Sequence, residues 1–205
     1  LAIRGFKPIL EIMFGDFITL ISDQIINGAS KFQWMYSGNI SIPMVIRTPM
    51  GGRRGYGPTH SQTLESLFFG IPGINIVAPS NFHEPGELLK NAVLISEFPT
   101  IFIENKLLYP AQLKASNKNH KIDDYYCTEI QNTDKNFPSI SLILENDMKP
   151  DITLITYGGM APIASEAALK VFMEDETVVE IIITSLVKPF PLADVLPSVK
   201  KSGRA

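Results

Sequence analysis

Short β-rich runs alternate with helix-like stretches through the first half of the sequence, and this alternation restricts the fold more than any other feature. In the first helix-like stretch, apolar residues recur at spacings of three and four, as on one helix face. Chains with this order build a mainly parallel sheet with helices on both faces. We therefore predict an α/β fold whose first strand is buried. Strands are expected at residues 7–13, 44–47, 74–78 and 100–104, and helices at 18–32, 63–69 and 84–95.

The regular pattern fades from about Tyr109 and restarts at Asp151. We interpret residues 1–110 as one α/β domain, 111–150 as an interdomain connection with some local structure, and 151–205 as the start of a second α/β domain. The helix after Gly158 is predicted to carry Ile163, Ala167 and Val171 on one face. In this half, strands are expected at 139–144, 152–157 and 178–183, and a helix at 192–200.

Composition excludes several classes of protein. The chain has 205 residues, 45% of them apolar and 19% charged, which is typical of a globular fold. A formal charge of −3 gives no general attraction to nucleic acid or acidic membranes, and no apolar run approaches the roughly 18–20 residues of a membrane span. A lone cysteine, Cys127, excludes an internal disulfide framework and fits a buried thiol in a reducing compartment. Because Leu1 replaces an initiator Met and no signal-peptide layout follows, we expect the chain to begin within a domain.

A loop rich in Gly and Pro follows the second expected strand, over residues 47–62. Its glycines permit close approach of backbone amides to a ligand, and Arg47, Arg53 and Arg54 are suited to a carboxylate or phosphate. His60, at the far end of the loop, is suited to proton exchange near neutral pH. A solvated loop with an ordinary histidine is the equally supported alternative, and the glycine spacing matches neither a Walker loop nor a dinucleotide fingerprint.

Three other residue types need an interpretation. Glu11 stands on an apolar strand and must be solvated, paired or functional, with structural pairing favoured. Phe17 suits either a core position or stacking on a ring. His83 and His120 are far apart and lack ligand-like neighbours, so no zinc site is expected.

Several blocks together resemble the beta subunit of thiamine-diphosphate-dependent 2-oxoacid dehydrogenases. The blocks keep their order and spacing across about residues 1–110, and the Pro-Thr-His-Ser-Gln piece that contains His60 is fairly specific. Residues 151–205 resemble the beginning of the same family's carboxyl-terminal transketolase-type domain, with weaker motifs. The matching blocks cover residues 11–17, 23–27, 47–62, 71–80 and 102–109.

The resemblance implies a pyrimidine-binding domain and a definite set of cofactors and partners. Enzymes of this family use thiamine diphosphate to decarboxylate a 2-oxoacid and pass the acyl group to the lipoyl arm of an acyltransferase. The alpha subunit holds the diphosphate and magnesium, the beta subunit receives the aminopyrimidine, and two of each form a heterotetramer. A cytoplasmic location is implied, or the mitochondrial matrix in a eukaryote.

The resemblance also implies roles for individual residues. Phe17 matches an aromatic that packs against the pyrimidine, and Leu20 matches a variable position of the same pocket. His60 matches the active-site histidine, which moves protons or stabilises charge during acyl transfer. Arg53 and Arg54 are interpreted equally as contacts for the oxoacid or partner and as solvated structural residues.

The sequence departs from the family in two respects. In the family, the glutamate that activates the pyrimidine belongs to a segment upstream of the strand that carries Glu11, and no residue of this sequence fills that position. Gly70 stands where many relatives have a second histidine. We therefore expect this chain alone to be a weakly active fragment of an enzyme subunit. Another transketolase-type enzyme acting on sugars, and a noncatalytic assembly scaffold, remain alternatives. The choice among pyruvate, branched-chain oxoacids and acetoin stays open.

Overall fold

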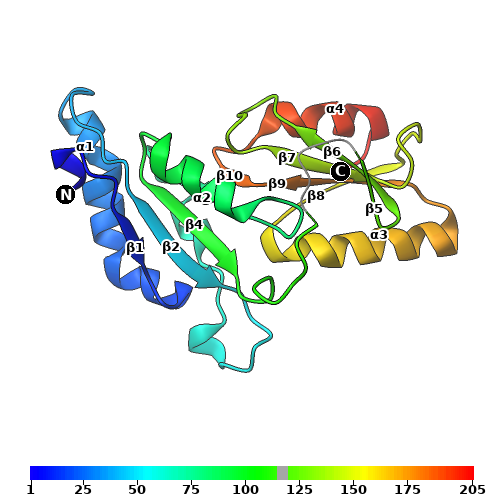
Figure 1. Cartoon of the computed structure of the whole chain (residues 1–205), viewed down its shortest axis with the longest axis horizontal. Helices are drawn as coiled ribbons and strands as arrows, with labels where there is room; N and C mark the ends of the chain where they lie inside the picture. The colour runs from blue at the N-terminus through cyan, green and yellow to red at the C-terminus, as the bar shows by residue number, and fades with distance from the viewer. Residues whose placement is uncertain (115–119) are drawn as a thin grey trace.

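The computed structural model describes residues 1–114 and 120–205, which form two five-stranded sheets covered by helices (Figure 1). This confirms the α/β fold class. The strands are β1 Ile9–Glu11, β2 Val45–Met50, β3 Asn75–Val77, β4 Thr100–Asn105, β5 His120–Ile122, β6 Tyr125–Ile130, β7 Ser139–Ile143, β8 Ile152–Tyr157, β9 Val179–Thr184 and β10 Leu186–Lys188. The α-helices are α1 Ser30–Met35, α2 Pro85–Leu94, α3 Ala161–Asp175 and α4 Leu192–Ser202. Shorter helical turns are η1 Ala2–Arg4, η2 Gly15–Ile21, η3 Gln24–Ala29, η4 Pro58–His60, η5 Glu65–Phe68 and η6 Gly158–Met160.

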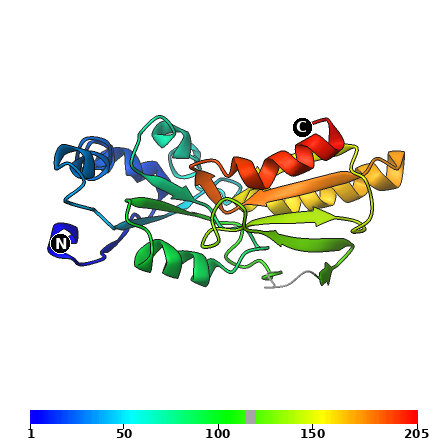
Figure 2. The same cartoon turned by 90° about the horizontal axis from the view of Figure 1, so that it is seen from above.

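The first sheet has the order β1-β2-β4-β3-β10, in which the first four strands are parallel and β10 is antiparallel. Alternate residues of its strands enter different cores, as the pleat requires. Val45 and Phe102 pack with α2, whereas Ile46 and Ile101 pack with residues of η2, η3 and η5. Figure 2 shows these two sets of helices on opposite faces of the sheet. The prediction of a mainly parallel sheet with helices on both faces is confirmed here.

The prediction that the first strand is buried is wrong. Only Ile9–Glu11 forms a strand, and all three residues are exposed. Among the described residues β1 is an edge strand that pairs only with β2, which leaves its other edge open.

Two expected boundaries also differ in the structure. β2 continues through Thr48 and Pro49 to Met50, because β4 pairs with it over that whole length. The Pro49 ring is tolerated because β1 stops opposite Arg47, which leaves the other edge of β2 free there. The helix expected over 18–32 is a succession of 3₁₀, π and α turns that still buries Ile18 and Ile25.

The second sheet has the order β5-β6-β7-β9-β8, with only β8 and β9 parallel. Three of its strands lie between residues 120 and 143, which is more regular structure than the polar sequence pattern indicated. The division of the chain into domains stays a prediction. β9 runs through Ser185 into β10, so one continuous stretch of chain joins the two sheets.

Helices α3 and α4 cover opposite faces of the second sheet (Figure 1). The buried residues of α3 are Ala161, Ala164, Ser165 and Ala168, whereas Ala167 is exposed and Ile163 and Val171 are half-buried, so the face singled out from the sequence is not the most deeply buried one. Small side chains let the helix approach the sheet closely, which larger residues at these positions would prevent. The layer under α4 is polar: the buried Asp194 carboxylate accepts hydrogen bonds from Ser139 Oγ at 2.6 Å and Thr133 N at 2.8 Å.

Adjacent alanines of α3 test this assignment of its buried face. Ala168→Leu should lower the free energy of unfolding by about 1–3 kcal/mol, because extra methylenes enter a filled core. Ala167→Leu adds the same side chain to an exposed position and should change it by less than about 0.5 kcal/mol. Urea unfolding followed by circular dichroism measures both, and equal losses would show that the helix packs through a different face.

Candidate functional site

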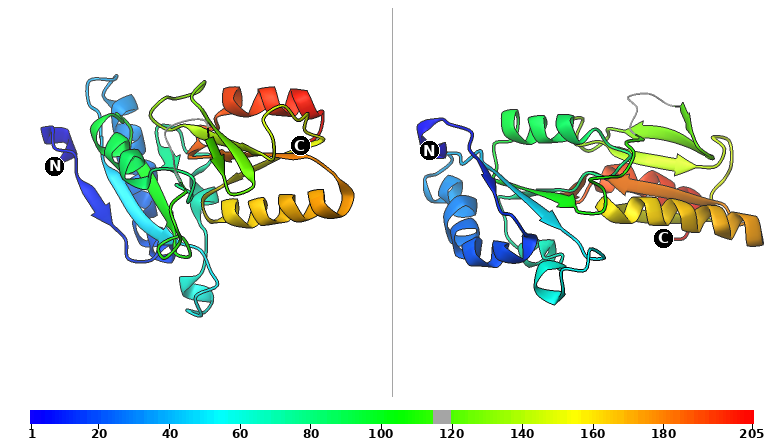
Figure 3. Two further views of the ribbon diagram at one scale, coloured as in Figure 1. Left: turned by 45° about the vertical axis from the view of Figure 1, so that its right-hand side comes forward. Right: turned by 60° about the horizontal axis from the view of Figure 1, so that its bottom comes forward.

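The carboxyl ends of the parallel strands bring two loops together. β1 leads into η2, and β2 leads into the Gly-rich loop 51–62, which carries η4. Figure 3 shows this loop projecting beyond the end of β2. Because parallel strands end at one edge of the sheet, loops that are distant in sequence meet there. The predicted Phe17 and His60 thus approach each other although 42 intervening positions separate them in the chain.

Four rings form an aromatic cluster at this edge, namely Phe14, Phe17, Tyr56 and His60. The His60 ring lies 4.6 Å from Phe14 and 5.4 Å from Phe17, centroid to centroid, in edge-to-face geometry. Phe14 also meets Phe17 at 6.1 Å and Tyr56 at 5.7 Å. These are favourable aromatic geometries, and they hold the imidazole against apolar surface.

Hydrogen bonds hold the ends of the loop to the sheet and to η2. The buried Asp16 accepts hydrogen bonds at Oδ1 from Gln62 Nε2 at 2.7 Å and from Gln62 N at 3.3 Å. Gly51 N donates to the carbonyl oxygen of Gln62 at 3.3 Å, which closes the base of the loop. His60 Nδ1 contacts the hydroxyl oxygen of Thr59 at 3.0 Å.

Leu20 is not among the residues of the aromatic cluster, and its side chain is 82% exposed. Phe17 and Leu20 are three residues apart on a 3₁₀ helix, whose turn contains three residues, so both lie on one face of η2. That face would extend a ring-binding surface beyond Phe17. The roles of Phe17, Leu20 and His60 stay predictions.

The charged candidates have structural partners. Arg47 pairs with Glu11 at 3.2 Å and with Glu104 at 2.7 Å, which confirms the pairing interpretation of Glu11. Tyr109 OH also donates to Glu104 at 2.6 Å. The hydrogen bond from Arg47 to Glu104 outweighs desolvation and raises the pKa of the guanidinium.

The other loop arginines differ from each other. Arg54 donates to the carbonyl oxygen of Lys106 at 3.4 Å, whereas Arg53 is exposed and has a positive φ of 65°. Cys127 is buried in β6, as predicted, and burial, assisted by Glu129, raises its pKa to about 11. This thiol therefore stays protonated at neutral pH.

Sequence reasoning missed two members of this site. Phe14 contacts the other three rings, and Lys106 donates from Nζ to the carbonyl oxygen of His60 at 2.5 Å. The available signal was position: Lys106 directly follows β4, at the same sheet edge as the loop. Among residues 1–114 and 120–205, no group of three His, Cys, Asp or Glu side chains is placed to hold a metal ion.

A cavity of about 300 Å³ lies between the strand ends of the two sheets. Its walls include Gly51, Asn105 and Glu65 from the first half of the chain and Tyr157 from the second. The Tyr157 hydroxyl donates to Glu65 Oε1 at 2.7 Å, and burial together with this bond raises the tyrosine pKa. The pair is a polar contact between the two halves.

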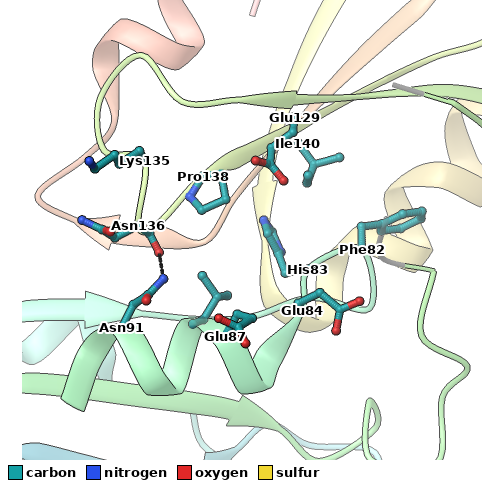
Figure 4. A pocket seen from close by; sticks show the side chains of 11 residues that line it. Phe82, His83, Glu84, Glu87, Asn91, Glu129, Lys135, Asn136, Pro138 and Ile140 are labelled. Carbon is teal, nitrogen blue, oxygen red and sulfur yellow. Dashed lines mark hydrogen bonds between the residues drawn. The ribbon is translucent and has the colours of Figure 1, made fainter. Parts of the chain in front are cut away.

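A smaller cavity of about 150 Å³ lies between α2 and the second sheet (Figure 4). The His83 side chain points into this junction, with Glu87 and Asn91 on one side and Glu129 on the other. His83 Nδ1 accepts a hydrogen bond from Ser80 N at 3.2 Å, so the ring proton is on Nε2. Burial lowers the pKa of His83 to about 4, against an opposing effect of the Pro138 and Ile183 carbonyls.

Residues 1–112 match the family described as the transketolase pyrimidine binding domain. The chain belongs to this family. The helices of the described residues include none that is long and apolar enough to cross a bilayer.

Similar curated proteins are beta subunits of 2-oxoacid and acetoin enzymes. Pyruvate dehydrogenase E1 component subunit beta-1, mitochondrial, from Arabidopsis thaliana is 32% identical, and the alignment covers 99% of this chain and 52% of that protein. Acetoin:2,6-dichlorophenolindophenol oxidoreductase subunit beta from Cupriavidus necator is 32% identical, and the alignment covers 98% of this chain and 54% of that protein. 2-Oxoisovalerate dehydrogenase subunit beta from Pseudomonas aeruginosa is 31% identical, and the alignment covers 98% of this chain and 56% of that protein. The chain thus spans about half the length of the curated relatives it matches.

Solved structures show the same fold at low identity. A split-gene transketolase in an inactive beta4 tetramer aligns with a TM-score of 0.66 at 17% identity, covering 100% of this chain and 58% of that one. Transketolase from Campylobacter jejuni aligns with a TM-score of 0.63 at 17% identity, covering 93% of this chain and 27% of that one.

The free energy of unfolding of this chain should fall in acid, because the buried His83 resists protonation. Its folded-state pKa of about 4 lies below the ordinary histidine pKa of 6.5, so the unfolded state binds the proton more tightly. The stability contributed by the neutral ring is complete above about pH 6.5 and is lost as the pH falls toward 4, by an amount on the order of 3 kcal/mol.

His83→Asn is the matched variant, because its side-chain oxygen can replace Nδ1 as acceptor for Ser80 N without titrating. Urea midpoints measured from pH 7 to pH 4 should fall less steeply for this variant than for the wild type. Parallel curves would contradict the buried neutral histidine.

Proposed function

We propose that this chain forms part of the beta subunit of a thiamine-diphosphate-dependent 2-oxoacid dehydrogenase. The observation that carries the proposal is the 5.4 Å approach of the Phe17 and His60 rings at the sheet edge. Support also comes from the pyrimidine-binding family match over residues 1–112 and from the names of the relatives. A 2-oxoacid is the substrate class, and lipoyl acyltransferase receives the acyl group.

The aromatic cluster fits the ring end of the cofactor. Phe17 is partly exposed beside an imidazole, and Leu20 extends the same helical face into solvent. A flat heteroaromatic ring packs favourably on such a surface. The diphosphate and magnesium are assigned in this proposal to a partner alpha subunit. The chemistry supplied by bound thiamine diphosphate is nucleophilic decarboxylation of the 2-oxoacid.

Within this site, His60 exchanges protons or stabilises charge during acyl transfer. Its Nδ1 contacts Thr59, so Nε2 is the atom assigned to the reacting group. Phe14 and Phe17 hold the imidazole plane by edge-to-face contacts and exclude water from one side. A fixed imidazole contributes to catalysis because its nitrogen already lies where the proton must move.

We infer the surfaces that bind partner subunits from exposed apolar side chains. Leu20 and Trp34 are 82% and 87% exposed, on the helical segment that covers one face of the first sheet. Large exposed apolar residues are typical of interaction surfaces. We assign these surfaces to the alpha subunit and a second beta subunit. The location proposed is the cytoplasm, or the mitochondrial matrix in a eukaryote.

Variants of the aromatic cluster test the function in the assembled enzyme. The polypeptide that contains this chain is combined with an alpha subunit, thiamine diphosphate and magnesium, and oxoacid-dependent dye reduction and lipoyl acylation are measured. His60→Ala should lower the acylation rate by about 10²–10⁴-fold while leaving cofactor affinity nearly unchanged. Phe17→Ala should instead weaken cofactor binding by about 3–10-fold.

Phosphosugar donors serve as the alternative substrates. Turnover of phosphosugars without turnover of oxoacids would identify a sugar-transferring enzyme of the transketolase type. Wild-type acylation rates in His60→Ala would contradict the proposed role of the imidazole. The described chain alone should show little activity, since it offers only the ring-binding part of the site.

A further inference from the structure

Lys106 is a buried lysine that has no carboxylate partner in the described part of the chain. Its residue surface is 5% exposed, and it forms no ion pair among the residues that the structure describes. Burying an ammonium group is costly unless other contacts replace its water. The contacts made by Lys106 therefore show which interactions offset the cost of burying its ammonium group.

Those contacts all lie in the aromatic cluster and its loop. Nζ donates to the carbonyl oxygen of His60 at 2.5 Å and lies 4.8 Å from the ring centroid of Phe14 and 5.8 Å from that of Tyr56. A cation over an aromatic face is attracted by the ring quadrupole, most strongly where water is excluded. The carbonyl of Lys106 meanwhile accepts from Arg54 at 3.4 Å. Lys106 therefore contacts the loop at Arg54, Tyr56 and His60, and contacts Phe14 beside it.

The loop needs such an attachment because its backbone is intrinsically adaptable. Gly51, Arg53, Gly55 and Gly57 all have positive φ, and glycine backbones lose much conformational freedom when they are ordered. Asp16 and Gly51 fix the loop at its base through Gln62. Lys106 acts instead on the turn that carries the imidazole. Its own backbone is fixed by donation from Lys106 N to Met50 O at 3.0 Å, beside the β2–β4 pairing.

We propose that Lys106 is a positioning residue, which attaches the His60 turn to the end of β4 and holds the imidazole against Phe14 and Phe17. It acts through the backbone of His60. The consequence for acyl transfer rests on the function proposed above, whereas the attachment itself is a property of the folded chain. The two are therefore tested by separate measurements.

Lys106→Met tests the attachment, since it keeps the length and apolar stem but removes the donor and the charge. Hydrogen exchange of the peptide around His60 should accelerate by about 10-fold in this variant, because a charged hydrogen bond no longer closes the turn. Exchange in β9 should be unchanged. The His60 ring protons, assigned with His60→Gln, should lose the ring-current displacement caused by Phe14 and Phe17. The chain has three histidines, which keeps this spectrum simple.

Two further variants separate positioning from general packing. Lys106→Arg keeps a buried donor and charge, and it should restore exchange to within about 3-fold of the wild type. Lys114→Met removes another lysine that lies over a phenylalanine, 5.7 Å from the Phe82 centroid, and should leave the His60 signals unchanged. If Lys106→Met does not fold, Lys106→Gln, which retains a neutral donor, is measured in its place, with partial loss of the ring-current displacement expected.

Unchanged exchange and unchanged His60 ring signals in the folded, uncharged variant would overturn the proposal. In the assembled enzyme, Lys106→Met should lower the acylation rate by about 10-fold with an unchanged KM for the cofactor. An assembled wild type that lacks oxoacid activity would refute the proposed function, while the exchange and ring signals would still decide the role of Lys106.

Discussion

The parallel pairing of β2 with β4 is the interaction on which the rest of the site depends. It runs from Val45 opposite Thr100 to Met50 opposite Asn105, so both strands end at the same edge. The Gly-rich loop leaves one strand there, and Lys106 follows the other. Because β1 joins the same parallel set, the turn after it delivers Phe14 and Phe17 to that edge. A shift of one residue between β2 and β4 would invert side-chain directions and separate these groups.

The second half of the chain meets the first through polar contacts, strand pairing and apolar packing. Tyr157 donates to Glu65, and β10 pairs with β3, so both the side chains and the backbone connect the two halves. The buried His83 lies at a second junction, where α2 meets the sheet of β6 and β7 (Figure 4). Burial there favours the uncharged imidazole near neutral pH, so protonation of the ring opposes its burial.

The sequence alone predicted the order of strands and helices in the first half, because buried parallel strands and their helices carry clear apolar patterns. It failed where burial depends on the neighbouring layer. β1 reads as a buried strand but lies at an edge. The contact face of α3 centres on Ala161, Ala164 and Ala168, with Leu169 and Phe172 packed beside them. His60 was singled out from its place in the Gly-rich loop, Phe17 as an aromatic suited to stacking and Glu11 from its charge on an apolar strand, whereas the family resemblance supplied the roles of Phe17 and His60. Lys106 was overlooked, since the value of a lysine at that position comes from a carbonyl 46 positions away.

We propose that the edge carrying Phe17 and His60 receives the aminopyrimidine of a cofactor shared with a partner subunit. A crystal structure of the assembled enzyme with thiamine diphosphate bound tests this most directly. We predict that the pyrimidine lies against the Phe17 ring, at a van der Waals distance of about 4 Å, with the imidazole of His60 facing the reacting end of the cofactor. A cofactor ring bound against other residues, with Phe17 and His60 exposed to solvent, would contradict the account.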